Sequence, residues 1–232
     1  MNLYAADEED RILWELVGDK EDGFYIDVGA QPAEGAVSRS FYEAGWTGIN
    51  IEPQAHLLNP FYAAQPKSRN LCCALSDQEG EPMALYGPRP GDNRPNAVDW
   101  TTLSPKIAAV TGLVPTGLVP VTTLAAVCAR WKVAQVDWLK IDTETWEAKV
   151  IAGADWERWR PRFCCIESFV PHTPEHIDAG AYRTYANEAD GEGITWRPPQ
   201  RSYEEWEPFL VDQGYELVTE YLINRFYRRV HD

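Results

Sequence analysis

The chain has 232 residues, 44% of them hydrophobic, which suits one domain with a proper core. A formal net charge of −15 argues against a nucleic-acid partner, because such a partner needs lysine and arginine to displace phosphate counterions. No apolar run reaches the roughly 18 residues of a membrane span, the N-terminus does not resemble a signal peptide, and the five cysteines fit neither a zinc site nor a disulfide framework. We therefore expect a single cytoplasmic domain over residues 1–232. The sequence does not determine its oligomeric state.

The N-terminal part, residues 1–22, is predicted to carry one helix over 7–17. Asp7 can cap this helix, and Gly18 can end it. The apolar run of residues 24–28 is typical of a buried parallel strand. Gly29 follows this run and lets the backbone turn tightly beside a ligand.

A second strand over 46–51 is expected after a helix over 36–44, in which Val37, Phe41 and Ala44 share one apolar face. Glu52 stands at the end of that strand, where a carboxylate can accept hydrogen bonds from both hydroxyls of a ribose. Strand, glycine turn, helix, strand and acid together favour an adenosine-type cofactor in a doubly wound fold.

The turn itself indicates which cofactor this is. A dinucleotide fold usually shows Gly-x-Gly-x-x-Gly, because the pyrophosphate needs free backbone N–H groups. Here Pro32 offers no N–H, and Glu34 would repel phosphate. Asp27 and Glu34 suit a cofactor with a cationic end, such as S-adenosylmethionine, although a nucleotide-dependent oxidoreductase on a similar sheet stays an alternative.

The middle of the chain is less regular. Strands are plausible at 69–75 and 83–86, on either side of a turn at 76–80. The stretch 87–117 is rich in glycine and proline, residues that disfavour helix and central strand. We predict a loop insertion here, acting as a lid or substrate loop, with a plain surface insertion as the alternative.

The second half again alternates strands and helices. A helix capped by Thr122 or Thr123 precedes a strand over 136–141, a short helix then ends at Gly153, and a further strand covers 163–166. Ser202 and Glu205 have the spacing of a capping box, which predicts a helix from there to Gly214. Two closing strands at 215–219 and 223–228 complete an α/β fold: a mostly parallel, doubly wound sheet with an antiparallel edge strand.

Four acids lie at or just after strand ends, namely Asp27, Glu52, Asp142 and Glu167. In open α/β sheets the carboxyl ends of parallel strands form one rim, where ligands bind, so we expect these acids to converge. His172 and His176 lie soon after Glu167 and offer a base or an acceptor contact, or are solvated loop residues. Trp100 and Trp196 stand in polar surroundings, where their rings could stack on a sugar.

Several motifs together resemble those of FkbM-type methyltransferases, over residues 23–228. They are YIDVGA at 25–30, FYE-x-GW-x-GINIEP at 41–53, VPVTTL at 119–124, LKID-x-E at 139–144, and NRFY at 224–227. The resemblance implies a Rossmann-like class I fold and S-adenosylmethionine-dependent O-methylation. It also implies a small-molecule or glycan acceptor, often a sugar hydroxyl in glycan or polysaccharide biosynthesis and sometimes a natural product.

The resemblance also implies site residues. Asp27, Gly29 and Ala30, with the adjoining Gln31, match the turn that holds the methionine end, and Glu52 matches the ribose-binding acid. Ser76 and Asp77 match the segment near the adenine, and Asp142 and Glu144 match the motif facing the reaction centre. This chain departs from the family pattern at Thr145 and Trp146, where the family commonly has glycine and alanine. Those departures keep open a module that binds the cofactor without turnover.

Methyl transfer to a hydroxyl needs an acceptor oxygen held near attack distance and a group that manages its proton. Asp142 is the first candidate for the general base, Glu167 the second, with Glu144 and His172 as further candidate catalytic residues. A divalent cation held by Asp142 and Glu167 is the less favoured version, because two carboxylates alone make an incomplete site for a hard ion.

Overall fold

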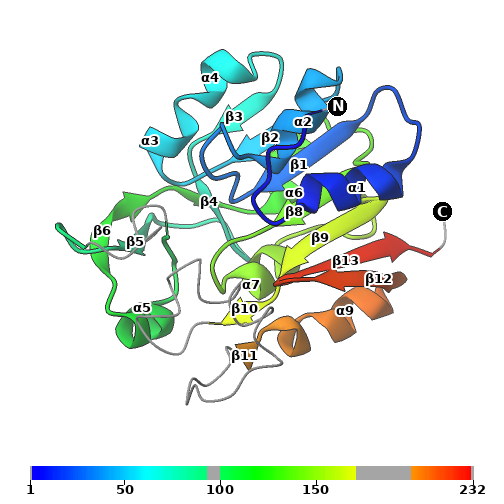
Figure 1. The fold of residues 1–232 in the computed structure, drawn as a ribbon. Coiled ribbons are helices and arrows are strands. Elements are labelled where there is room, and N and C mark those ends of the chain that lie inside the picture. The colour runs from blue at the N-terminus through cyan, green and yellow to red at the C-terminus, as the bar shows by residue number, and fades with distance from the viewer. Residues whose placement is uncertain (1, 93–99, 171–199, 231–232) are drawn as a thin grey trace, which may run out of the picture.

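The structure, a computed structural model, describes residues 2–92, 100–170 and 200–230. Its centre is a seven-stranded sheet in the order β12-β13-β9-β8-β1-β2-β3 (Figure 1). These strands are β1 Phe24–Val28, β2 Thr47–Ile51, β3 Arg69–Leu71, β8 Trp138–Ile141, β9 Phe163–Glu167, β12 Tyr215–Tyr221 and β13 Asn224–Arg229. Neighbours from β3 to β9 run parallel, as predicted.

The predicted antiparallel edge lies one strand further in. β13 runs antiparallel to both β9 and β12, so the antiparallel strand is second from the edge and β12 is the edge. The chain builds β1, β2 and β3 in one direction and then returns to place β8 on the other side of β1. The gap between the ends of β1 and β8 is therefore the switch point of the topology.

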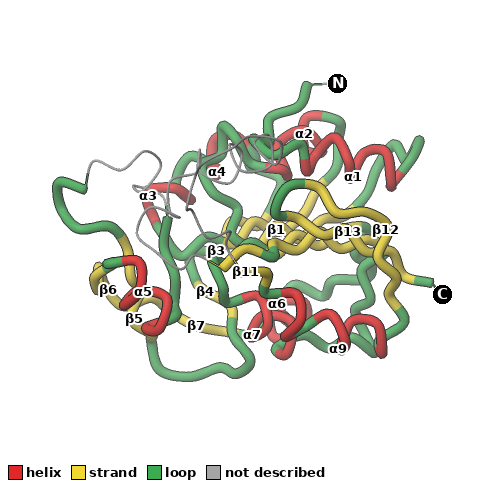
Figure 2. The backbone as a smooth tube through the Cα atoms, turned by 60° about the horizontal axis from the view of Figure 1, so that its bottom comes forward, coloured by secondary structure: helices red, strands yellow, loops and turns green. Residues whose placement is uncertain are grey.

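Helices cover both faces of the sheet (Figure 2). One face carries α1 Glu9–Val17 and α2 Val37–Glu43, with the short α3 Ala55–Leu58 and α4 Phe61–Ala64 nearby; the other carries α6 Leu124–Arg130, α7 Glu147–Ala152 and α9 Glu207–Asp212. The strand residues alternate between two cores. Ile26 and Leu139 pack in the larger core, whereas Tyr25 and Trp138 stack at 5.0 Å in the core beneath α1 and α2.

The same alternation places two charges inside the sheet. Asp27 and Lys140 stand opposite each other in the β1–β8 register. Both are buried, and Lys140 Nζ lies 3.8 Å from Asp27 Oδ1. Buried charges need partners of opposite sign, so this ion pair accounts for two polar residues in otherwise apolar strands.

The predicted loop over 87–117 is wrong for its second half. β5 Met83–Gly87 pairs antiparallel with β6 Val114–Val119, and α5 Pro105–Thr111 lies between them in the sequence. Ser104 caps this helix, because its hydroxyl accepts a hydrogen bond from the N–H of Ile107. These elements form a lobe beside the sheet (Figure 1), and residues 93–99 lie outside the described residues.

Other expectations need smaller corrections. The strand expected at 69–75 is split into β3 and β4 Ala74–Leu75, and β4 pairs with β7 Val121–Thr122 outside the main sheet. Asp7 is not the cap of α1, since Glu8 occupies that position. Ser202 makes no capping hydrogen bond either: a 3-10 helix, Tyr203–Glu205, follows it, and α9 begins later.

Two further features complete the described chain. β10 Phe169–Val170 pairs antiparallel with β11 Gln200–Arg201. Within the described ranges, the structure contains no helix with the length and apolar character that crossing a bilayer requires.

Candidate functional site

A cavity of about 530 Å³ opens where β1, β2, β8 and β9 end, at the switch point of the sheet. Its walls come from residues 5–9, the turn after β1, the segments after β2 and β8, residues 100–103, and the start of β13. Small-molecule sites usually have volumes of roughly 300–1,000 Å³. The cavity is therefore large enough for a nucleoside-sized ligand with part of a second molecule.

The turn after β1 requires glycine. Gly29 has a φ of 74°, and a Cβ added there would lie 1.7 Å from the carbonyl oxygen of Asp142. The N–H groups of Gly29 and Ala30 both donate to the carbonyl of Ile51, at 2.9 and 3.1 Å. The turn thus ties β1 to β2 and leaves these two amides bonded within the protein.

Glu52 forms one side of the cavity and is only 4% exposed. Its carboxylate accepts hydrogen bonds from the backbone N–H groups of Gln54 at 2.9 Å and Gln31 at 3.3 Å. Burial raises the pKa of Glu52 to about 7, although these two hydrogen bonds oppose the shift.

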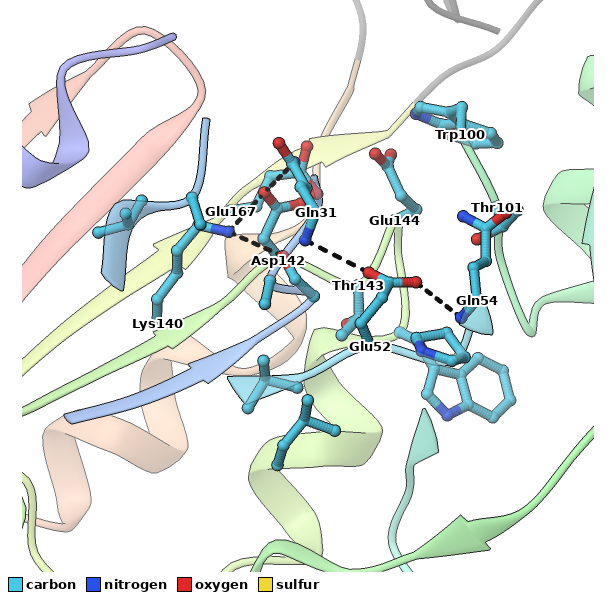
Figure 3. A pocket seen from close by; sticks show the side chains of 18 of the residues that line it. Gln31, Glu52, Gln54, Trp100, Thr101, Lys140, Asp142, Thr143, Glu144 and Glu167 are labelled. Atoms are coloured by element: carbon cyan, nitrogen blue, oxygen red, sulfur yellow. Dashed lines mark hydrogen bonds and ion pairs between the residues drawn. The ribbon is translucent and has the colours of Figure 1, made fainter. Parts of the chain in front are cut away.

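Gln31 connects Glu52 to the other acids (Figure 3). Its side-chain Nε2 donates to Asp142 Oδ2 at 2.9 Å, the same oxygen that Lys140 Nζ contacts at 2.9 Å. Lys140 also donates to the carbonyl of Gly29 at 3.2 Å. Burial alone would lower the pKa of Lys140, but the carboxylates of Asp142 and Asp27 outweigh it and raise that pKa, so Lys140 is a cation.

Asp142, Glu144 and Glu167 form a carboxyl cluster at the centre of the cavity (Figure 3). Each offers an oxygen within 4.8 Å of the others. Burial first, and then repulsion by the neighbouring acids, raises the pKa values of Glu144 and Glu167 well above the usual range. In the described part of the chain, Glu144 Oε2 and Glu167 Oε2 have no hydrogen-bond partner.

A strained loop holds Glu144 in this cluster. Glu144 and Thr145 have φ values of 53° and 76°, a left-handed backbone that costs about 1–3 kcal/mol for residues other than glycine. Glu147 fixes the loop, since one carboxylate oxygen accepts from Thr143 N at 3.0 Å and Thr145 N at 3.1 Å. Thr102 adds a 2.8 Å hydrogen bond to the carbonyl of Glu144, which joins the lobe to the site.

The remaining predicted site residues lie in different surroundings, and not all of them line the cavity. Asp27 is fully buried, accepts a hydrogen bond from Ser38 N at 3.2 Å, and is not exposed to the cavity. Ser76 lies 3.3 Å from Nε1 of Trp146, a cavity residue, whereas Asp77 pairs with Lys149 at 2.7 Å. Trp100 lines the cavity at 9% exposure and hydrogen-bonds Glu144. His172, His176 and Trp196 lie outside the described residues.

Glu9 is a cavity residue that the sequence did not reveal. It is buried and accepts hydrogen bonds from the N–H of Asp7 at 3.1 Å and from Asn224 Nδ2 at 3.4 Å. Burial raises the pKa of Glu9 to about 7, although Lys140 opposes the shift. Glu9 stands in the acidic run 7–10 at the start of a helix, and nothing in that local pattern indicates a place in the cavity.

These observations define an α/β protein with a mostly parallel sheet and an acid-lined cavity at the carboxyl ends of its strands. The family model described as Methyltransferase FkbM domain matches residues 27–217, well over half of the chain. The chain therefore belongs to the FkbM methyltransferase family, as its motifs predicted. A comparison with curated proteins finds no match.

Proposed function

We propose that this protein is a class I, S-adenosylmethionine-dependent O-methyltransferase that acts on a sugar hydroxyl in glycan or polysaccharide biosynthesis. The observation that carries the proposal is the buried Glu52 carboxyl, which lines the same cavity as the carboxyl cluster. One acid suits a ribose, and the cluster suits an acceptor hydroxyl and its proton. A cytoplasmic location and the absence of a nucleic-acid partner stay predictions from composition.

The residues present fit this cofactor. Glu52 would hold the ribose hydroxyls, and the turn of Gly29, Ala30 and Gln31 would hold the methionine end. The bonded N–H groups of Gly29 and Ala30, and that of Gln31 on Glu52, leave the turn without the free donors that a pyrophosphate needs. This pattern supports S-adenosylmethionine over a dinucleotide, and so argues against the oxidoreductase alternative.

The bound cofactor supplies an electrophilic methyl group. The role of the protein is to orient the acceptor hydroxyl and to accept its proton, and Asp142 is the proposed base. Lys140 and Gln31 both donate to Asp142 Oδ2, so this carboxylate is held in one orientation. Glu167 is the second candidate, and it would share a proton with Asp142 through the hydrogen bond between them.

Trp100 and Glu144 support a sugar as the acceptor. The indole and the carboxylate line one side of the cavity (Figure 3), which offers a ring face and hydrogen-bond acceptors for hydroxyls. A small natural product with a similar hydroxyl is the second candidate acceptor. The non-catalytic alternative rests on Thr145 and Trp146, which stand in and just after the strained loop where the family commonly has glycine and alanine.

A divalent cation is not part of the favoured mechanism, although the cluster has the composition for one. Asp142, Glu144 and Glu167 offer three oxygens, whereas hard cations usually take about six or more ligands. Lys140 already supplies a positive charge next to Asp142. The proposed proton transfer to Asp142 does not depend on a metal.

The test is calorimetric titration of S-adenosylmethionine into the wild type and Glu52→Ala. We expect binding to the wild type and at least tenfold weaker binding to the variant, because the ribose loses a charged hydrogen-bond acceptor worth about 1.5–3 kcal/mol. Folding of the variant is checked by circular dichroism. Failure of the folded wild type to bind S-adenosylmethionine would refute the proposed function.

A further inference from the structure

The cavity is strongly acidic. Six of its described lining residues are acids: Asp7, Glu9, Glu52, Asp142, Glu144 and Glu167. Against them, Lys140 is the cation that the described lining contains.

Lys140 neutralises only part of this charge. Its ammonium lies 2.9 Å from Asp142 Oδ2 and 3.8 Å from Asp27 Oδ1, so two carboxylates already share it. Glu144 and Glu167 remain, each with one buried oxygen that lacks a hydrogen-bond partner among the described residues. Glu167 is only 3% exposed, so its oxygen is turned away from solvent and toward the cluster.

Unpartnered buried carboxyl oxygens are costly and are stabilised by a ligand that brings positive charge or donors. A cation that enters the cavity favours the ionised form of Glu144 and Glu167, whereas a neutral ligand offers these carboxylates no opposite charge. The low effective dielectric of a buried site strengthens this difference.

The position of Gln31 links the cluster to the cofactor site. Its backbone N–H bonds Glu52 and its side chain bonds Asp142, so it lies between the ribose anchor and the carboxyl cluster. The sulfur of S-adenosylmethionine joins the ribose to the methionine chain. With these two parts held as proposed, Gln31 and Asp142 would lie on the side of the cavity nearest the sulfonium.

We propose that the Glu144 and Glu167 carboxyls make this cavity select its ligand by charge, so that the sulfonium donor binds much more tightly than the neutral thioether left after transfer. This inference rests on the proposed function. Its consequence is that the spent cofactor, S-adenosylhomocysteine, is a weak product inhibitor, since loss of the methyl group removes the charge that the cluster recognises. Glu144 and Glu167 thereby determine specificity, apart from any part in proton transfer.

The experiment compares S-adenosylmethionine and S-adenosylhomocysteine by calorimetric titration, with EDTA present to keep divalent cations out of the cluster. The proteins are the wild type, the double variant Glu144→Gln/Glu167→Gln, and the control Glu15→Gln. The control removes one negative charge from a side chain on α1 that is 65% exposed and paired with Arg11. Circular dichroism and thermal unfolding check that each variant folds.

We expect the wild type and the control to bind S-adenosylmethionine at least tenfold more tightly than S-adenosylhomocysteine. In the double variant this ratio should fall below threefold, mainly through weaker binding of S-adenosylmethionine. Equal affinity of the two ligands for the wild type would overturn the inference and leave the proposed function standing, as would an unchanged ratio in the double variant. Absence of binding by either ligand would overturn both.

Discussion

Glu52→Gln should make the ligand-free protein less sensitive to alkaline pH. Burial raises the pKa of Glu52 from 4.5 to about 7, so the folded state holds this proton more tightly than the unfolded chain. The free energy of unfolding therefore falls as the pH rises from 4.5 through 7. Between pH 5 and pH 8 this one carboxyl removes about 2–3 kcal/mol, at about 1.4 kcal/mol per pKa unit.

The glutamine variant lacks this titration. The two oxygens of Glu52 accept one hydrogen bond each, from the N–H groups of Gln31 and Gln54. Glutamine has only one carbonyl oxygen to accept them, so the free energy of unfolding of the variant is lower by about 1 kcal/mol at every pH. We expect Glu52→Gln to be slightly less stable than the wild type at pH 5 and more stable at pH 8. The same variant should bind S-adenosylmethionine at least tenfold more weakly.

Urea unfolding at pH 5 and pH 8, without ligand, measures the effect in the wild type, Glu52→Gln and the surface control Glu15→Gln. The other raised carboxyls, among them Glu9 and Glu147, titrate in all three proteins and cancel in the comparison. If the stabilities of the wild type and Glu52→Gln changed in parallel with pH, the carboxyl would not be held in its neutral form by burial. The reasoning would then fail.

Four further predictions follow from the site. Gly29→Ala should lower the free energy of unfolding by about 2 kcal/mol or more in urea titrations, since its Cβ would lie 1.7 Å from the Asp142 carbonyl. Thr145→Gly should leave the thermal midpoint unchanged or raise it, because relief of about 1–3 kcal/mol of left-handed strain offsets the added freedom of the unfolded chain, about 1 kcal/mol. Asp142→Asn should reduce turnover by about 10²–10⁴-fold with cofactor affinity kept within a few-fold, and full activity would exclude it as the base. Treatment with EDTA should leave turnover unchanged; loss of turnover that magnesium restores would instead establish the metal-assisted version.

The sequence predicted β1, β8 and β9 well because each is a short, mostly apolar run that both faces of a parallel sheet can bury. It predicted the rim acids for a related reason, since a charge directly after such a run must lie at a strand end. Asp27 was predicted with the other rim acids but lies elsewhere. It lies within β1, opposite Lys140, and its charge serves a buried ion pair and is not exposed to the cavity.

The sequence of the lobe contains signals for helix α5, but the prolines before this helix outweighed them in the prediction. Ser104, Pro105 and Gly112 are a helix cap, a first-turn proline and a C-terminal glycine, and these residues bound α5. The prolines of residues 88–95 suggested that the whole stretch to 117 was irregular. Ser202 and Glu205 are the opposite case, because their capping-box spacing precedes a 3-10 helix without a side-chain cap. Local spacing does not report the tertiary contacts that decide between these outcomes.

Glu9 and Asn224 extend the site beyond the segment that the family model matches, which runs from 27 to 217. Trp14 of α1 stacks on Phe41 of α2 at 4.3 Å, and Asn224 at the start of β13 donates a hydrogen bond to Glu9, so both contacts hold the start of α1 in place. Glu9 is also one of the acids that keep Lys140 charged. The glycine turn and Glu52, which would bind the cofactor, therefore lie within the matched segment. Glu9 and Asn224 lie outside it, and they contribute to the charges and hydrogen bonds around Lys140 and the proposed base Asp142. A difference in acceptor or in product release between members of one family can then arise from the two ends of the chain, without any change in the motifs that define the family.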